Sequence, residues 1–540
     1  MPKYEKGILG VRKDPKNQIL FSFNVREGEE WPSDDSDDSD YNPGESLELL
    51  SKSKENSSSD EAKSAHDMAK KYKSVEIPSK KQKRDDSNKD DRVRNAKKKN
   101  AAERETVSSS IKCTTKIDLP PEIWMKIFHF VVEVDGALPF LPRASRVCRS
   151  WNEFTSEPSL WEKVDLSYGW AKVDEKHMDW LCKNRFSKTK DLNLSLCKEV
   201  NGKILKMISQ NCPNLRSINL SYCKKCPSET LTILAEGCKL LEDVDVSFTN
   251  KDVVSHIPLR GFISTQGPCL RRLTLGGNKF VGLNLVLNDL MEKCPNLELL
   301  DISNALFSNN SMAFNVEKLY VGCPKLEILR LSNSPFRASS CSLREMLQYI
   351  AQSDGFLHLK ELSIACSSSG TVDTSIGITS TFIYRILRRS YNLKLLDMRG
   401  ISEYSCIVTV IQLPIEGLER LYMSNSAVAR FDRLHSLIRK WKHSLLEVDL
   451  SWNSFHGEIL DLGLYAFTEG KGHSPLQRLN IAGTPVNLLP VQSILKLCKD
   501  LHYLNLTSCR AIPRGFRREY RNRQEIDKLR EDILNCSDSE

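Results

Sequence analysis

The chain has 540 residues, of which 40% are hydrophobic, and its net charge of +8 is modest. It contains no apolar run of about 18 residues or more, so we expect no membrane-spanning helix and no membrane partner. The first residues, MPKYEKGILGVRKD, lack the basic-then-apolar layout of a secretion signal. We therefore expect the 17 cysteines to be free, mostly buried thiols in a reducing compartment, rather than a disulfide framework.

The first 112 residues divide into two parts. Residues 1–27 are predicted to contain a β-hairpin, because two alternating segments flank turn-forming residues at 14–17. Residues 28–112 are predicted to be disordered. An acidic run at 33–40 and a basic stretch at 68–104 leave too few apolar residues there to form a core.

Two basic clusters lie within this second part. Their separation is the layout of a bipartite nuclear localisation signal, which predicts a protein of the nucleus and/or cytoplasm. A solvated charged linker explains the clusters equally well, and the neighbouring acids argue against a nucleic-acid partner. The residues of the predicted signal are Lys80, Lys81, Lys83 and Arg84 in the first cluster and Lys97, Lys98 and Lys99 in the second.

Residues 113–166 are predicted to form a small all-α module. Pro120 and Pro121 suit the start of a helix, and Glu122 in the first turn suits the helix dipole. Apolar residues then recur at steps of three and four, in a stripe wider than one short helix needs to cover a neighbour. A second amphipathic helix is predicted at 143–154. Because such short helices cannot bury all these side chains against one another, we expect part of the apolar surface to form an interface.

From residue 167 to 510 the chain repeats the pattern L-x-x-L-x-L at intervals of 25 to 34 residues. This period is typical of leucine-rich repeats, in which a short strand and a returning helix stack on their neighbours. We therefore predict an α/β fold: a leucine-rich-repeat solenoid with a curved parallel sheet and outer helices, preceded by the all-α module and a disordered tail. The twelve repeats begin at Thr189, Leu215, Leu241, Leu270, Leu297, Leu326, Leu359, Leu393, Leu418, Leu445, Leu476 and Leu501.

Both ends of the solenoid are predicted to be closed. Residues 163–166 resemble a degenerate first strand, and Trp161 is expected to pack at a rigid joint between the module and the repeats. Residues 511–540 are predicted to form a cap helix, at 515–534, and a tail. Cysteines such as Cys212 recur three residues before the first leucine of a repeat and are expected to be small buried corner residues.

The sequence carries no motif of bond chemistry. It contains no G-x-S-x-G, no phosphate loop and no H-E-x-x-H. Cys223 and Cys226 form a single C-x-x-C, and a tetrahedral zinc site would need two further ligands. We therefore expect no metal, no cofactor and no catalytic residue.

Residues 118–166 resemble the F-box, a small helical motif. The marks are Leu119-Pro120-x-Glu122-Ile123, Ile127-Phe128, Ser145-x-Val147-Cys148-Arg149-x-Trp151 and Pro158-x-Leu160-Trp161. Because leucine-rich repeats follow directly, the chain is similar to the F-box and leucine-rich-repeat proteins. The 19 residues from Phe128 to Val147 exceed the usual spacing, and we expect the extra residues to form a loop around Asp135 and Gly136.

This resemblance implies a non-catalytic substrate-recognition subunit of a Skp–cullin–F-box ubiquitin ligase. The F-box would bind a Skp-type adaptor, which connects to the cullin and RING subunits, and the repeats would hold a protein substrate for ubiquitination and proteasomal degradation. An alternative for Phe128 and Trp151 is that they form the module's own core. The adaptor-binding residues that the resemblance implies are Leu119, Pro120, Glu122, Ile123, Ile127, Phe128, Val131, Val147, Cys148, Trp151, Leu160 and Trp161.

The concave face of the solenoid is the expected substrate site. At the middle position between the strand leucines of each repeat, eight of the twelve residues are Asn or Asp, which could form an acidic or amide-rich strip but also suit the crowded centre of a curved sheet. Two other functions stay open: a non-ligase protein-binding scaffold in the nucleus, and a nucleic-acid-associated protein acting through the basic segment. A partly basic strip suited to an acidic or phosphorylated segment would consist of Arg272, Arg330, Arg399, Arg420, Tyr422 and Arg478.

Overall fold

The computed structural model describes residues 11–13, 19–21, 119–167, 169, 173–249, 253–307, 312–340, 342–366, 377–456, 458–470 and 474–537. The segment predicted to be disordered, with its two basic clusters, lies outside these residues. Near the amino terminus, β1 (Val11–Lys13) pairs with β2 (Ile19–Phe21) in an antiparallel arrangement. Within the described part of the chain, no helix is both long and apolar enough to cross a membrane.

The predicted all-α module is present. It consists of α3 (Pro121–Asp135), α4 (Phe140–Ala144), α5 (Arg149–Thr155) and the 3-10 helix η1 (Pro158–Trp161). The expected loop follows α3 directly. Gly136 has a φ of +86°, a left-handed conformation that favours glycine, and its N–H donates to the Val132 carbonyl at 3.0 Å. The chain can therefore leave α3 and turn towards α4.

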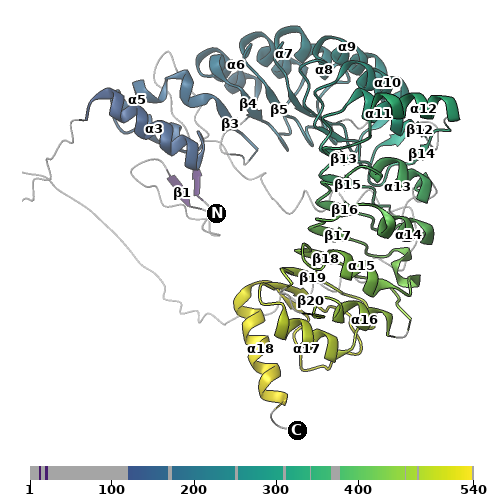
Figure 1. The fold of residues 1–540 in the computed structure, drawn as a ribbon. Coiled ribbons are helices and arrows are strands. Elements are labelled where there is room, and N and C mark those ends of the chain that lie inside the picture. Colours follow the sequence, from purple (N-terminus) through teal and green to yellow (C-terminus); the bar gives the residue numbers. More distant parts are fainter. Residues whose placement is uncertain are drawn as a thin grey trace, which may run out of the picture. The chain divides into compact units, whose positions relative to one another are not determined.

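The repeats form the predicted solenoid. A 14-stranded sheet lies along one face of it, and the helices lie along the opposite face (Figure 1). Each of the 13 parallel strands is three residues long, and its middle residue is buried beneath the helices. The parallel strands are β3 (Lys163–Asp165), β4 (Asp191–Asn193), β5 (Ser217–Asn219), β6 (Asp243–Asp245), β8 (Arg272–Thr274), β10 (Leu299–Asp301), β13 (Ile328–Arg330), β15 (Glu361–Ser363), β16 (Leu395–Asp397), β17 (Arg420–Tyr422), β18 (Glu447–Asp449), β19 (Arg478–Asn480) and β20 (Tyr503–Asn505).

The helices of the solenoid return the chain from one strand to the next. Several begin with a side-chain cap; Asn201, for example, accepts hydrogen bonds from the N–H groups of Lys203 and Ile204. The helices are α6 (Glu175–Asn184), η2 (Phe186–Lys188), α7 (Gly202–Asn211), α8 (Thr230–Gly237), α9 (His256–Gln266), α10 (Leu283–Lys293), α11 (Val316–Gly322), α12 (Leu343–Gln352), α13 (Ser380–Leu387), α14 (Tyr404–Gln412), η4 (Ala427–Arg430), α15 (Leu434–Trp441), α16 (Ile459–Tyr465) and α17 (Leu488–Leu497).

The longer repeats in the middle of the chain use their additional residues for two small parallel sheets. The first contains β7 (Val253–Ser255), β9 (Lys279–Val281) and β11 (Leu306–Phe307). The second pairs β12 (Met312–Phe314) with β14 (Phe336–Ala338). These extra strands lie in the repeats that begin at Leu241, Leu270, Leu297 and Leu326, and the main sheet continues past them without a break.

The corner cysteines are buried, as the repeat pattern predicts. Cys212, Cys238, Cys294, Cys323 and Cys498 all lie at the carboxyl ends of helices and are fully enclosed. Burial raises the pKa of the Cys294 and Cys323 thiols to about 12. These side chains therefore remain neutral thiols that fill the corner between a helix and the next strand.

The eight Asn and Asp residues at the third strand position share one structural role. Each accepts a hydrogen bond through Oδ1 from the backbone N–H two residues further on, which forms a turn at the end of the strand. This turn, rather than a binding strip, accounts for Asn and Asp at these positions. The acceptors are Asn193, Asn219, Asp245, Asp301, Asp397, Asp449, Asn480 and Asn505.

A left-handed residue follows each of these turns, three positions after the strand. Eleven such positions have φ between +47° and +73°, and six are occupied by Gly or Asn, which tolerate this conformation. Four carry bulky side chains instead: Leu196, Tyr222, Phe248 and Trp452. The N–H groups at these positions donate to the next repeat, for example from Trp452 to the Ala482 carbonyl at 2.7 Å. These bonds fix the left-handed backbone.

Replacing Gly483 with alanine should destabilise the solenoid by about 1–3 kcal/mol. Gly483 has a φ of +68°, and a Cβ atom there would lie 2.4 Å from Cε3 of Trp452. Urea denaturation followed by circular dichroism measures the loss. Gly515→Ala is the control, because no atom lies within 4 Å of its added Cβ; equal stability of the two variants would contradict the prediction.

The carboxy-terminal cap differs from the prediction. The cap helix, α18 (Arg523–Ser537), begins later than residue 515. Before it, β21 (Glu519–Tyr520) pairs antiparallel with β20, with Tyr520 opposite Leu504. The predicted helix was wrong in this part because the last strand of a sheet offers unpaired backbone groups, and a short strand satisfies them.

Candidate functional site: an exposed apolar face on the amino-terminal module

One side of α3 carries a line of exposed apolar side chains. Ile123, Ile127, Phe130 and Val134 follow one another at steps of four, three and four, so they lie along one face of the helix. Their exposed fractions range from 38% to 66%, and Val147, just before α5, is 50% exposed. Contiguous exposed apolar surface of this kind marks a protein interface.

The opposite side of α3 packs into an aromatic cluster. Phe128 is only 1% exposed, and its ring lies 5.1 Å from that of Trp151 at an interplanar angle of 89°. Trp124, Phe140 and Phe154 complete the cluster, with ring centroids 6.3, 5.4 and 5.9 Å from Phe128. Edge-to-face pairs of this kind add to the stability gained by burial. The three helices are therefore held together without help from the exposed face.

Three of the predicted adaptor contacts are wrong. Phe128, Leu160 and Trp161 are at most 4% exposed, so their side chains belong to the core and cannot touch a partner. Trp151 is half-buried in the aromatic cluster, which matches the alternative of a core role. Helical spacing predicted a wide stripe correctly, but it could not tell which edge of the stripe faces the module's own core.

Most of the other predicted residues do lie at the surface. Pro120, Glu122, Ile123, Ile127, Val147 and Cys148 are exposed, and Leu119 and Val131 are partly buried. The sequence analysis missed Phe130 and Val134. Both continue the i+3 and i+4 spacing from Ile127 and could have been found by extending the line along the helix.

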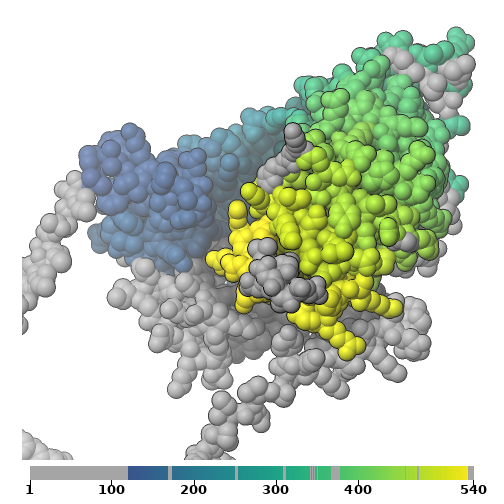
Figure 2. All heavy atoms as spheres, turned by 60° about the horizontal axis from the view of Figure 1, so that its bottom comes forward, coloured from purple at the N-terminus to yellow at the C-terminus, as the bar shows by residue number. Residues whose placement is uncertain are grey.

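The joint between the module and the first repeat is tightly packed, with Trp161 where the sequence places it. Its Nε1 donates to the Thr155 carbonyl at 2.8 Å, and its carbonyl accepts from Oγ1 of Thr189 at 2.7 Å. Its ring lies 6.4 Å from that of Phe186 in the first repeat. The module, in blue, is continuous with the teal repeats in the space-filling view (Figure 2). The exposed face is therefore carried by a rigid extension of the solenoid.

Four of the five arginines in the predicted strip pair with acids, so the strip carries less positive charge than the prediction assumed. Arg330 pairs with Glu361 at 2.6 Å, Arg399 with Asp397 at 2.7 Å, Arg478 with Glu447 at 3.2 Å and Arg272 with Asp243 at 3.7 Å. Arg420 is exposed. Burial and the nearby Glu447 raise the pKa of Tyr422 to about 12. The acidic partners lie on neighbouring strands or at the end of the strand before the arginine. The spacing of the repeats alone therefore does not reveal these ion pairs.

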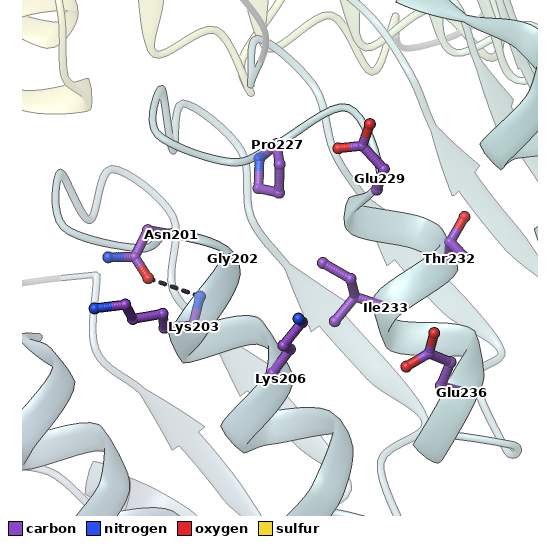
Figure 3. A pocket seen from close by; sticks show the side chains of 9 residues that line it. All are labelled: Asn201, Gly202, Lys203, Lys206, Pro227, Glu229, Thr232, Ile233 and Glu236. Atoms are coloured by element: carbon purple, nitrogen blue, oxygen red, sulfur yellow. Dashed lines mark hydrogen bonds between the residues drawn. The ribbon is translucent and has the colours of Figure 1, made fainter.

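A groove of about 600 Å³ lies between α7 and α8 on the helix side (Figure 3). Lys203 and Lys206 line it together with Glu229 and Glu236, so its charges balance. Among the described residues, no group of three or more His, Cys, Asp or Glu side chains could hold a metal ion. Cys223 and Cys226 are both buried.

The comparisons with known proteins agree with the module. A family model described as F-box-like matches residues 117–167. F-box protein SKIP19 of Arabidopsis thaliana is 28% identical over 110 residues, which cover 19% of this chain and 34% of that protein. Putative F-box/LRR-repeat protein 9 of the same plant is 28% identical over 105 residues, or 18% of this chain and 41% of that protein. Lysine-specific demethylase 2B of Mus musculus is 26% identical over 118 residues, or 18% of this chain and 8% of that protein.

Each of these three sequence alignments covers less than half of the relative's own length.

Among solved structures, one of the yeast Rad7 and Elc1 complex shows 17% identity over 73% of this chain and 83% of that chain, with a TM-score of 0.37. Leptospira interrogans LRR protein LIC12759 shows 16% identity over 69% of this chain and 94% of that chain, with a TM-score of 0.31. The family match at residues 117–167 and the parallel sheet of the repeats show that the chain joins an F-box-like domain to a leucine-rich-repeat solenoid, the organisation of the F-box and leucine-rich-repeat proteins.

Proposed function

We propose that this protein is the substrate-recognition subunit of a Skp–cullin–F-box ubiquitin ligase. An F-box domain implies binding to a Skp-type adaptor, and the exposed line of Ile123, Ile127, Phe130 and Val134 is the observation that carries the proposal. These side chains are not needed by the module's core, and covering them with a partner helix would remove apolar surface from water.

The repeats are the proposed substrate-binding part. A solenoid presents a long surface made of many stacked units, which suits the recognition of a protein substrate. Because the joint at Trp161 is packed and hydrogen-bonded, a bound substrate would stay at a defined distance from the adaptor, the cullin and the RING subunit. The contribution of this subunit would be positioning and raised local concentration, without bond chemistry of its own.

We also propose that the protein acts in the nucleus and/or cytoplasm, on the basis of the clusters Lys80–Arg84 and Lys97–Lys99 in the sequence. The alternative function is a non-ligase binding scaffold. A scaffold that used only its repeats would have no use for five exposed apolar side chains on α3 and before α5, so this face favours the ligase function.

Affinity purification from cells tests the proposal. The intact protein should recover a Skp-type adaptor and a cullin, and the variant Ile123→Asp/Val147→Asp should recover neither, because both side chains lie on the exposed face. Proteins recovered with both forms are candidate substrates. Recovery of other partners but no adaptor by the intact protein would reject the ligase function in favour of the scaffold.

A further inference from the structure

Three consecutive repeats at the start of the solenoid build an exposed apolar ridge. Leu196, Tyr222 and Phe248 occupy the same position after β4, β5 and β6, where later repeats carry mostly Gly or Asn. Leu196 is 62% exposed and Tyr222 is 45% exposed. The rings of Tyr222 and Phe248 stack in parallel, with centroids 4.7 Å apart and an interplanar angle of 4°. Tyr222 and Phe248 therefore form a stacked pair, and Leu196 occupies the equivalent position in the repeat before them.

Neighbouring groups hold the ridge in place. The N–H groups of Leu196 and Tyr222 donate to the carbonyls of Ser221 and Ser247 at 2.8 and 3.0 Å. The Phe248 ring covers Gly277, where an added Cβ would lie 2.2 Å from the ring. The protein thus keeps three bulky side chains in a backbone conformation that disfavours them, and the first two, Leu196 and Tyr222, are left in solvent. Aromatic side chains fixed in this way are efficient contacts for a partner, because little side-chain freedom is lost on binding.

The same strands form a pocket with the loop of the amino-terminal module. This pocket has a volume of about 650 Å³ and lies between loop residues 134–139 and the outward side of β3, β4 and β5. Asp135, Asp165 and Asp191 line it, against one base, Lys163. Within the described part of the chain, neither Asp135 nor Asp191 makes an ion pair.

The negative charge continues onto the next strand. Asp243 and Asp245 are the outward residues of β6, and strand register places Asp191, Ser217 and Asp243 side by side. Burial, together with the Asp245 and Asp191 carboxylates, holds the pKa of Asp243 above its ordinary value, although Arg272 lies 3.7 Å away and opposes this shift. Because Asp243 already pairs with Arg272, the charges available to a bound cation are those of Asp135 and Asp191.

We propose that the first repeats bind an extended segment of a partner protein in which a lysine or arginine lies beside an apolar residue. The basic side chain enters the pocket at Asp135 and Asp191, and the apolar side chain packs against the ridge of Leu196, Tyr222 and Phe248. Charge complementarity selects this occupant over an acidic or phosphorylated one. The inference rests on the proposed function only in treating the bound segment as part of the substrate.

A displayed library of random twelve-residue peptides, selected on the full-length protein, tests this inference. Enriched peptides should carry Lys or Arg within a few residues of an aliphatic or aromatic residue. The variant Leu196→Asn/Tyr222→Asn should bind the enriched peptides about tenfold more weakly or worse, as expected for truncated interface anchors. Asparagine suits the left-handed backbone, so the variant should fold normally. Trp452→Asn, at the same position of a distant repeat, is the matched control and should keep full binding.

A second variant tests the pocket. Asp135→Asn/Asp191→Asn should weaken binding of the same peptides by a similar factor, because it removes the negative charge of the two side chains without changing the shape of the pocket. Adaptor binding is measured on every sample. If peptide selection fails while adaptor binding is intact, the result counts against this inference and leaves the proposed ligase function untouched.

Four results would overturn the inference: no enrichment, enrichment of acidic peptides, equal loss in Trp452→Asn, or binding that survives both variants. Self-association that is lost in Leu196→Asn/Tyr222→Asn would assign the ridge to a second copy of this chain instead. Zero-length cross-links from Lys80–Lys99 of the same chain to Asp191 would assign the pocket to that basic segment.

Discussion

Replacing Arg385 with alanine should lower the free energy of unfolding by about 3–5 kcal/mol, because it leaves Glu317 as a buried unpaired charge. Arg385 on α13 donates through Nε to Oε1 of Glu317 on α11 at 2.7 Å, and through Nη1 to the Ser339 carbonyl at 3.0 Å. The two side chains are 13% and 4% exposed. The pair therefore joins two repeats across the intervening α12.

An exposed pair of the same chemistry is the control for this variant. Arg439 and Glu469 lie 2.6 Å apart, but their side chains are 54% and 43% exposed. Arg439→Ala should therefore cost at most about 1 kcal/mol. Urea denaturation followed by circular dichroism measures both. The double variant Glu317→Leu/Arg385→Met should recover most of the loss, since it removes both buried charges. Similar losses for Arg385→Ala and Arg439→Ala would contradict the role given to the buried pair.

Introducing aspartate at Ile127 or Phe130 should abolish most of the affinity for a Skp-type adaptor. Each change places a charge in the centre of the exposed face, and losing an interface anchor costs about 2 kcal/mol or more, which is about thirtyfold in the dissociation constant. The two together should weaken binding by several hundredfold. Isothermal titration of the purified chain with the adaptor gives the dissociation constants directly.

Measuring the free energy of unfolding of each variant separates a loss of adaptor binding from a loss of folding. Ile127 and Phe130 are exposed, so the aspartate variants should unfold within about 0.5 kcal/mol of the unmodified protein. Phe128→Ala, one residue away, should instead lose about 3–5 kcal/mol of stability, because it empties the centre of the aromatic cluster. Leu489→Asp, at an exposed leucine of α17, should bind the adaptor normally. Equal binding by Ile127→Asp and Leu489→Asp would contradict the proposed interface.

The repeat pattern predicted most of the fold because each strand needs a buried central residue and each corner a small one. Ile218 and Val244 at the strand centres, and Cys212 and Cys238 at the corners, satisfy these needs within two neighbouring repeats. Tyr520 was predicted to lie in a helix, but it lies in a strand that pairs with β20. This pairing depends on the edge of the folded sheet, about which local periodicity carries no information.

The sites were harder to predict, because one residue type can serve two purposes. Asn219 and Asp245 look like a binding strip, yet they close turns. Arg330 looks free, yet it pairs with Glu361 on the next strand, 31 residues away. Leu196 and Tyr222 look like ordinary repeat residues, and their exposure becomes visible only when the left-handed position is known. An alignment of the repeats at the residue that follows Ser195 and Ser221 would have shown Leu196 and Tyr222 at one equivalent position.

Hydrogen–deuterium exchange of the full-length protein, with and without a Skp-type adaptor, tests the central claim most directly. Exchange in α3 and around Val147 should slow when the adaptor is bound, with no change in α7 to α17. Exchange in α3 that stays the same at saturating adaptor, or protection confined to the repeats, would contradict it.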